Sequence, residues 1–201
     1  YQPHRDEFLY LAQGQHLAWG YLENPPVLGA LAWITHQLGG HFVLIKFWPS
    51  LFGTLTFVVT ARIIVSLNGG IYALFLSFLA FVFGAFLRVH YLFQPNFLEI
   101  FFYTLIAFAV IRYIQTKNNA YLYVFGIACG LGMLSKYSIA FFIAGVIVGL
   151  LLSSERSIYL NKHFYFASLI GVVICLPNYI WQYNHNYPLL HHMKELQETQ
   201  L

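Results

Sequence analysis

Six long apolar runs dominate the sequence and limit what the chain can fold into. They lie at about 43–66, 71–87, 97–115, 120–135, 137–153 and 164–182, with polar breaks between them. A helix needs roughly 17 to 25 apolar residues to cross a bilayer, and several of the runs are near the short end of that range. The runs predict an all-α membrane protein that is a bundle of about six transmembrane helices.

The composition agrees with a bilayer as the main solvent. Charged residues make up 8% of the chain, against roughly 25% in ordinary globular proteins, and apolar residues reach 59%. A soluble chain of this length would need more polar side chains to cover its surface. The net charge of +3 is scattered, which argues against a nucleic-acid partner. Cys129 and Cys175 lie in apolar runs without CxxC spacing, so we interpret both as small core residues.

A more polar segment, residues 1–41, precedes the first run. Within it, residues 6–19 have the apolar spacing of a helix that lies at a membrane interface. A second interfacial helix is predicted over 24–39, where asparagine is the N-cap, proline follows, and two glycines end the helix. Residues 42–201 form the transmembrane bundle. Because the chain has neither an initiator Met nor a signal peptide, we expect a fragment of a longer protein.

The fourth run, 120–135, is the weakest candidate for a membrane span. It contains Gly126, Gly130 and Gly132. Glycines let helix backbones approach closely, so this segment has a second interpretation as a helix packed among its neighbours.

Six crossings would divide the charges unequally between the two membrane faces. Lys and Arg split five against five, which does not orient the chain. The acids on the face that holds residues 1–41 are Asp6, Glu7, Glu23, Glu99, Glu195 and Glu198, and only Glu155 falls on the other face. One face therefore collects the acids together with half of the bases, as a polar reaction site would need.

Asp6 and Glu7 form the first candidate constellation, and Asp6 is the only aspartate in the chain. Adjacent side chains on a helix point about 100° apart, so one carboxylate can face a cavity while the other anchors the helix. The alternative is that both complement the positive end of the helix dipole.

Glu99 lies inside an apolar run, where an unpaired carboxylate costs several kcal/mol. It has two interpretations, as a structural ion pair with Arg88 or as part of a polar site that includes His90. Lys136 interrupts apolar sequence between the fourth and fifth runs. It either extends to the lipid headgroups or binds a phosphate.

Several common site motifs are missing from the sequence. HExxH is absent, and His191 and His192 are adjacent, which is poor spacing for joint metal ligation. P-loop and GxGxxG patterns are absent too, and a single aspartate cannot form a DxD motif. We therefore predict neither a metal nor a site for a soluble nucleotide donor.

Taken together, five segments resemble the GT-C membrane glycosyltransferases that take sugars from polyprenyl phosphates. They are HRDEFLYLAQGQHLAWGY, ENPPVLGALAWI, LFQPNFLEIFFYTLIA, GLGMLSKYS and LPNYIWQYNHNYP, in the order of the family. The similarity is to the bacterial branch related to protein O-mannosyltransferases and to the lipid A aminoarabinose transferase. It implies that residues 1–41 are the first extracytoplasmic loop and that a transmembrane helix precedes them.

The resemblance also implies roles for individual residues. Asp6 matches the catalytic acid, with Glu7 beside it, and Glu99 matches a second acidic position where relatives commonly have aspartate. An inverting transfer needs a carboxylate that takes the proton of the acceptor hydroxyl, which would be Asp6.

Cations are needed where the polyprenyl phosphate departs. Arg88 and Lys136 are the candidates for binding the donor phosphate. The candidates for lining the substrate site are Tyr10, Tyr21 and His90. The two tyrosines have a second interpretation as interfacial anchors.

The implied partners are a polyprenyl-phosphate sugar donor, a lipid, glycan or protein acceptor, and the lipid bilayer. No cofactor is expected. The implied location is the bacterial inner membrane, with the active site facing the periplasm. Two other functions stay open: a secondary transporter, which would normally show two related halves, and a non-catalytic membrane protein.

Overall fold

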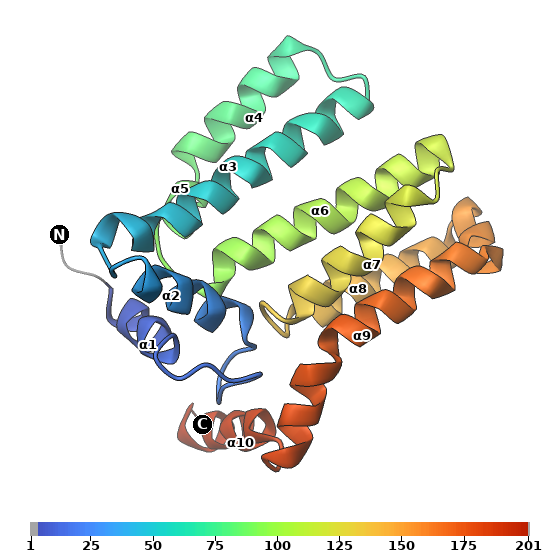
Figure 1. Cartoon of the computed structure of the whole chain (residues 1–201). Coiled ribbons are helices and arrows are strands. Elements are labelled where there is room, and N and C mark those ends of the chain that lie inside the picture. The colour runs from blue at the N-terminus through green and yellow to red at the C-terminus, as the bar shows by residue number, and fades with distance from the viewer. Residues whose placement is uncertain (1–3, 201) are drawn as a thin grey trace.

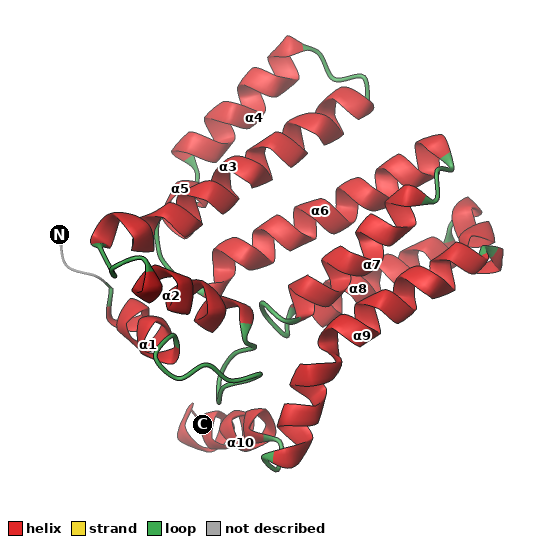
Figure 2. Ribbon diagram, in the orientation of Figure 1, coloured by secondary structure: helices red, strands yellow, loops and turns green. Residues whose placement is uncertain are grey.

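The structure is a computed structural model that describes residues 4–200, and every regular element in this range is a helix (Figure 1 and Figure 2). In chain order the elements are α1 (Arg5–Gln13), α2 (Val27–Gln37), α3 (Phe42–Ser66), α4 (Ile71–Phe83), α5 (Phe86–Val89), α6 (Pro95–Thr116), α7 (Ala120–Met133), α8 (Ile139–Leu152), the 3₁₀ helix η1 (Ser154–Leu160), α9 (Lys162–Asn184) and α10 (Pro188–Gln200). The predicted all-α fold class is confirmed.

Each of the six apolar runs forms a helix, but the helices differ in length. By length and composition, α3, α6 and α9 can cross a membrane. Helix α8 qualifies only together with η1, and the pair is bent by 108°. Helices α4 and α7 are apolar but shorter, and α4 stops where Gly84 takes an extended conformation. Three to four spans are therefore found among the described residues, and the full set of six crossings stays a prediction.

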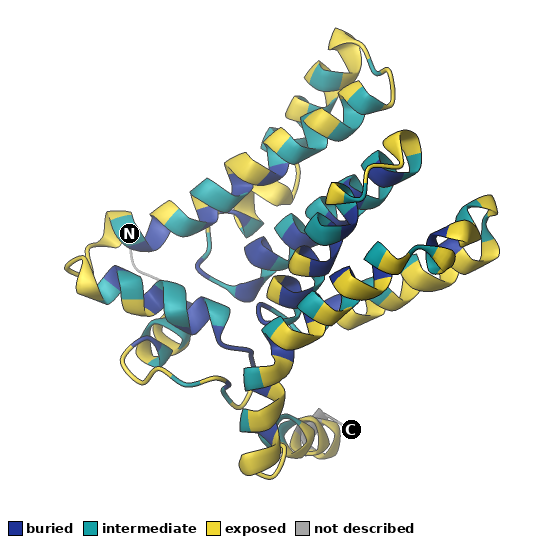
Figure 3. Cartoon of the chain, turned by 45° about the vertical axis from the view of Figure 1, so that its right-hand side comes forward, coloured by how far each residue is buried: buried dark blue, intermediate teal, exposed yellow. Residues whose placement is uncertain are grey.

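The outer surface of the bundle is apolar, as a lipid solvent requires. Large apolar side chains are exposed along several helices (Figure 3), with Tyr72, Phe83 and Phe141 each 83% exposed. Water would not stabilise so much exposed apolar surface. The chain is an integral membrane protein.

The predicted interfacial helix 6–19 is wrong at its C-terminal end, because α1 stops at Gln13. Gly14 packs so closely on α2 that a Cβ there would lie 2.6 Å from the backbone carbonyl carbon of Ala32. The side chains of Gln13 and Asn24 then exchange two hydrogen bonds of 3.0 Å. This amide pair closes the loop between the two helices.

The start of the second interfacial helix also differs from the prediction. Asn24 is buried and bonded to Gln13, so it does not cap α2, which begins at Val27. The backbone N–H of Val27 donates instead to the carbonyl oxygen of Leu134 at 3.0 Å. This bond ties the first loop to the end of α7.

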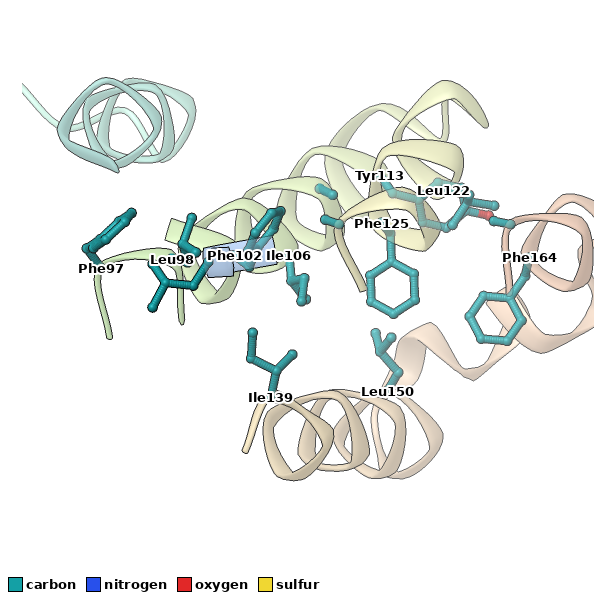
Figure 4. Packing of buried hydrophobic residues seen from close by; sticks show 14 of the residues in the cluster. Phe97, Leu98, Phe102, Ile106, Tyr113, Leu122, Phe125, Ile139, Leu150 and Phe164 are labelled. Atoms are coloured by element: carbon teal, nitrogen blue, oxygen red, sulfur yellow. The ribbon is translucent and has the colours of Figure 1, made fainter. Parts of the chain in front are cut away.

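The core forms where α6, α7 and α9 pack, with α8 beside them (Figure 4). Its buried side chains include Phe97, Leu98, Phe102, Ile106, Leu122, Phe125, Ile139, Leu150 and Phe164. Helix α7 is central because Gly126 and Gly130 face α9, while Gly132 faces α6 and α8. A Cβ on Gly126 would lie 2.1 Å from the carbonyl oxygen of Ala167. The predicted close packing of the fourth run is therefore confirmed.

The acidic residues are divided unequally between the two ends of the bundle. Helices α1, α2 and α10 lie at one end with the α5–α6 segment and the α7–α8 turn (Figure 1). Glu155 lies at the other end, where it pairs with Lys117. The predicted grouping of the remaining acids at the end that holds α1 is confirmed for Asp6, Glu7 and Glu99, whose contacts are described below.

Gly126→Ala should lower the stability of the bundle, because the new methyl group meets the backbone of α9. Overpacking of this kind costs about 1–3 kcal/mol. Gly145→Ala is the matched control, since nothing lies within 4 Å of a Cβ there. Alanine also favours the helix by about 1 kcal/mol in both variants. Thermal melting in detergent measures both, and equal melting temperatures would contradict the close approach of α7 and α9.

Candidate active site

Glu7 is the most deeply buried acid at the end of the bundle that carries α1. Its side chain is fully inaccessible, and Oε1 accepts hydrogen bonds from Lys46 Nζ at 2.5 Å and from the Phe93 N–H at 2.8 Å. Oε2 accepts the N–H of His4, the N-cap residue, at 2.7 Å. Glu7 thus joins α1, α3 and the segment before α6.

Burial alone would raise the pKa of Glu7 above its ordinary value. The Lys46 ammonium and the N–H groups of Phe93 and His4 more than offset this effect, so the pKa is lowered. Glu7 therefore stays ionised at neutral pH. The contacts of Glu7 give it an anchoring role, and a direct catalytic role for Glu7 stays a prediction.

Asp6 points in another direction from Glu7. Its side chain is 39% exposed, and Oδ2 accepts a hydrogen bond from Gln94 Nε2 at 3.1 Å. Arg5 Nε lies 3.7 Å from Oδ1, and His4 Nδ1 lies 3.6 Å from Oδ2. The predicted anchoring by one of the two carboxylates is confirmed for Glu7, and a cavity in front of Asp6 stays a prediction. Asp6 is held by Gln94 and is otherwise partly exposed.

Glu99 is paired with Lys136, so the interpretation of an ion pair with Arg88 is wrong. Lys136 Nζ lies 2.7 Å from Glu99 Oε2, while Oε1 accepts bonds from Ser138 and Tyr103 at 2.5 and 2.9 Å. The pairing arises because the α7–α8 turn, which holds Lys136, packs beside the first turns of α6, which hold Glu99. Arg88 lies on α5, where its side chain is exposed.

Lys136 keeps part of its surface free. Its side chain is 34% exposed, and Nζ also donates to Asn96 Oδ1 at 2.8 Å. An ammonium has three N–H donors, and Lys136 has two hydrogen-bond partners among residues 4–200, so one donor is open to a further partner. Arg88 is exposed on α5, and no ion pair involves it within residues 4–200. Phosphate binding by either cation stays a prediction.

The N-terminal end of α6 brings the two acidic centres together. Gln94, the N-cap of α6, contacts Asp6, and Glu99 follows five residues later. Five helical residues span about 7.5 Å along the axis. Asp6 and the Glu99–Lys136 pair therefore both contact the N-terminal part of α6.

The three candidate lining residues lie in different surroundings. Tyr10 is half-buried, and burial raises its pKa, with further contributions from the Glu23 and Asp6 carboxylates. Its phenol therefore shares the region of Asp6. Tyr21 donates its hydroxyl hydrogen to the carbonyl oxygen of Gln13 at 3.0 Å, and burial raises its pKa. Tyr21 holds the α1–α2 loop, and substrate contact by any of the three stays a prediction.

His90 is buried, and neither ring nitrogen has a hydrogen-bond partner among the residues that the structure describes. Its ring stacks on Phe81 with centroids 5.3 Å apart, and it packs against Gly53 of α3. Burial lowers the pKa of His90 to about 4. The imidazole is thus neutral at physiological pH.

The sequence analysis missed Lys46 and Gln94 as site residues. Lys46 carried a usable signal, because it is a cation inside an apolar run and must meet a partner there. Gln94 carried none, since a glutamine before proline fits many turns. Within residues 4–200, no three His, Cys, Asp or Glu side chains converge as metal ligands. Independence from metal stays a prediction.

Comparisons with a family model and with known proteins both match this chain to glycosyltransferases. A family described as dolichyl-phosphate-mannose-protein mannosyltransferase matches residues 23–181. The chain is also 22% identical over 200 residues to a protein named lipid A galacturonosyltransferase RgtD from Rhizobium johnstonii. That match covers 95% of this chain and 41% of the relative, so the chain spans less than half of the relative's length. No solved structure matches the chain.

The buried neutral state of His90 predicts a loss of stability in mild acid. The unfolded chain binds a proton at His90 below about pH 6.5, whereas the folded protein does so only near pH 4. Stability is therefore fully present above pH 6.5 and falls as the pH drops toward 4. Melting temperatures of wild type and His90→Phe between pH 7 and pH 4 test this. The variant should lose less stability across that window, and parallel curves would contradict the prediction.

Proposed function

The chain belongs to the dolichyl-phosphate-mannose-protein mannosyltransferase family, and from this premise we propose that it transfers a sugar from a polyprenyl-phosphate donor to an acceptor at the membrane face that carries α1. The observation that carries the proposal is the accessible Asp6 carboxylate, held by Gln94 beside the fully buried Glu7. The description of the family names a lipid-linked mannose donor, which supports the donor class.

Asp6 acts as the general base in the proposed reaction. Its free face accepts the proton of the acceptor hydroxyl while that oxygen bonds to the anomeric carbon of the sugar. The bond from this carbon to the phosphate oxygen breaks, and its electron pair leaves with the polyprenyl phosphate. Attack from the side opposite the leaving group inverts the anomeric configuration.

Negative charge develops on the departing phosphate oxygen, so a cation must lie near it. Lys136 supports this part of the proposal because one of its N–H donors is open and its side chain is 34% exposed. Glu99 holds the ammonium in place. Arg88 is the second candidate, since it lies at the same end of the bundle and its side chain is exposed.

A lipid-linked donor needs an apolar place for its chain. A cavity of about 340 Å³ lies between α7, α8 and α9, and Met133, Ala140 and Tyr179 line the part nearest the α7–α8 turn. Lys136 lies in that turn. We propose that part of the isoprenoid occupies this cavity, with its phosphate toward Lys136.

The location and acceptor follow from the same resemblance and are part of the proposal. The protein lies in the bacterial inner membrane with α1 facing the periplasm. The family description and the name of the relative indicate two donor and acceptor pairs to test: mannose with a protein hydroxyl, and galacturonic acid with lipid A.

Asp6→Asn should lower the rate of sugar transfer at least about 100-fold, because the amide cannot take the acceptor proton. The assay uses the full-length protein in proteoliposomes, with the two donor and acceptor pairs. Glu155→Gln is the matched control, since it removes an acid at the opposite end of the bundle.

Equal rates for wild type and Asp6→Asn would remove Asp6 from the chemistry. Transfer by the control but not by Asp6→Asn, with both variants folded, would support the base. If wild type transfers no sugar and instead accumulates a solute in the vesicles, the secondary transporter replaces the glycosyltransferase.

A further inference from the structure

The pairing of Lys46 with Glu7 is a feature that the proposed reaction does not use directly. Lys46 lies near the start of α3, and its side chain is 11% exposed. Besides Glu7, its ammonium faces the ring of Tyr91, with the centroid 4.4 Å away, and the ring of Phe42, with the centroid 5.4 Å away. The cation is thus enclosed by one carboxylate and aromatic faces.

Glu7 joins the segment that carries this enclosed cation to two other segments of the chain. The same Oε1 atom that meets Lys46 accepts the N–H of Phe93. Residues from α1, α3 and the segment before α6 therefore meet at a single oxygen. Such a junction fixes α1 relative to the start of α6.

The chain neighbours of Glu7 and Phe93 are also joined to each other by a hydrogen bond. Asp6 precedes Glu7, Gln94 follows Phe93, and Gln94 Nε2 donates to Asp6 Oδ2 at 3.1 Å. Glu7 and Phe93 meet at the junction, and each is the chain neighbour of one partner in this hydrogen bond. The junction therefore sets the position of the bond. A shift of α1 would move Asp6 away from Gln94.

We propose that Lys46 is a positioning residue for Asp6, acting through the Glu7 junction and the Gln94 hydrogen bond. The proposal rests on the proposed function of Asp6 as the base. Removal of the cation leaves a buried carboxylate without its counter-charge, a strongly unfavourable state. Glu7 then moves toward water to regain its solvation, and this movement loosens the junction.

The first test separates positioning from substrate contact by kinetics. Lys46→Met should lower kcat for sugar transfer about 10 to 100-fold, because a displacement near 1 Å has effects of this size. The KM for the donor should stay within about twofold, since Lys46 does not touch the donor. A large rise in KM with unchanged kcat would overturn the proposal and make Lys46 a substrate ligand.

The second test uses a double variant that removes both charges of the Glu7–Lys46 pair. Glu7→Gln combined with Lys46→Met removes both charges and keeps an oxygen that accepts the Phe93 N–H. The double variant should transfer sugar at least about tenfold faster than Lys46→Met alone. A double variant no faster than Lys46→Met would overturn positioning through Glu7. Lys117→Met is the matched control, because it breaks the Glu155 pair at the opposite end and should leave transfer unchanged.

The last arm does not depend on activity, so its failure is distinguishable from failure of the proposed function. Carbodiimide labelling of carboxylates, followed by peptide mass spectrometry, should modify Asp6 but not Glu7 in the wild type. In Lys46→Met, Glu7 should become labelled. Protection of Glu7 in that variant would overturn the junction, even if the wild type transfers sugar as proposed. Labelling of Glu7 would support it, even if no donor is turned over.

Discussion

A charge in apolar surroundings must meet an opposite charge or a set of hydrogen bonds, and this requirement organises the polar end of the bundle. Glu7 with Lys46 and Glu99 with Lys136 are two such pairs, with N···O distances of 2.5 and 2.7 Å. Each pair joins residues more than 35 positions apart in the sequence. Desolvation of a lone member would cost several kcal/mol. The pairs therefore hold α1, α3, α6 and the α7–α8 turn in one arrangement.

The bundle core and the polar end depend on different interactions. Between α7 and α9, backbones touch at Gly126, and the contact is short because no side chain intervenes. At the polar end, long side chains bridge gaps between segments that do not touch so closely. Packing fixes the bundle as a whole, while ion pairs and hydrogen bonds fix the first loop on it.

The sequence predicted where the helices of the bundle lie, because continuous apolar runs mark them, but it did not predict their lengths, since only three to four of the described helices are long enough to span a membrane. It also predicted that Asp6 and Glu7 diverge, which follows from helical geometry alone. It did not predict that α1 ends at Gln13, since the loop beyond depends on Gln13 meeting Asn24 and on Gly14 meeting α2. These are tertiary contacts that no local pattern encodes.

The partner of Glu99 illustrates the same limit at the candidate site. The cost of a buried charge indicates that a partner exists, but the sequence offers both Arg88, eleven residues away, and Lys136, between the fourth and fifth apolar runs. Proximity in sequence favours Arg88. The fold favours Lys136, because the α7–α8 turn packs beside the start of α6. Only the arrangement of helices decides between two cations of equal charge.

The distribution of charge across the polar end constrains how substrates could lie in the proposed reaction. Burial, the Glu23 carboxylate and the Asp6 carboxylate raise the pKa of Tyr10, so two negative charges lie near its phenol. A donor phosphate would be repelled there. It would be attracted to Lys136, whose ammonium is held by Asn96 and Glu99 of α6. An uncharged acceptor hydroxyl has no such penalty and can approach the free face of Asp6. Inversion needs the attacking oxygen and the leaving phosphate on opposite sides of the anomeric carbon, so a negative base and a positive phosphate site at separate positions suit the proposed reaction better than two such groups at one position.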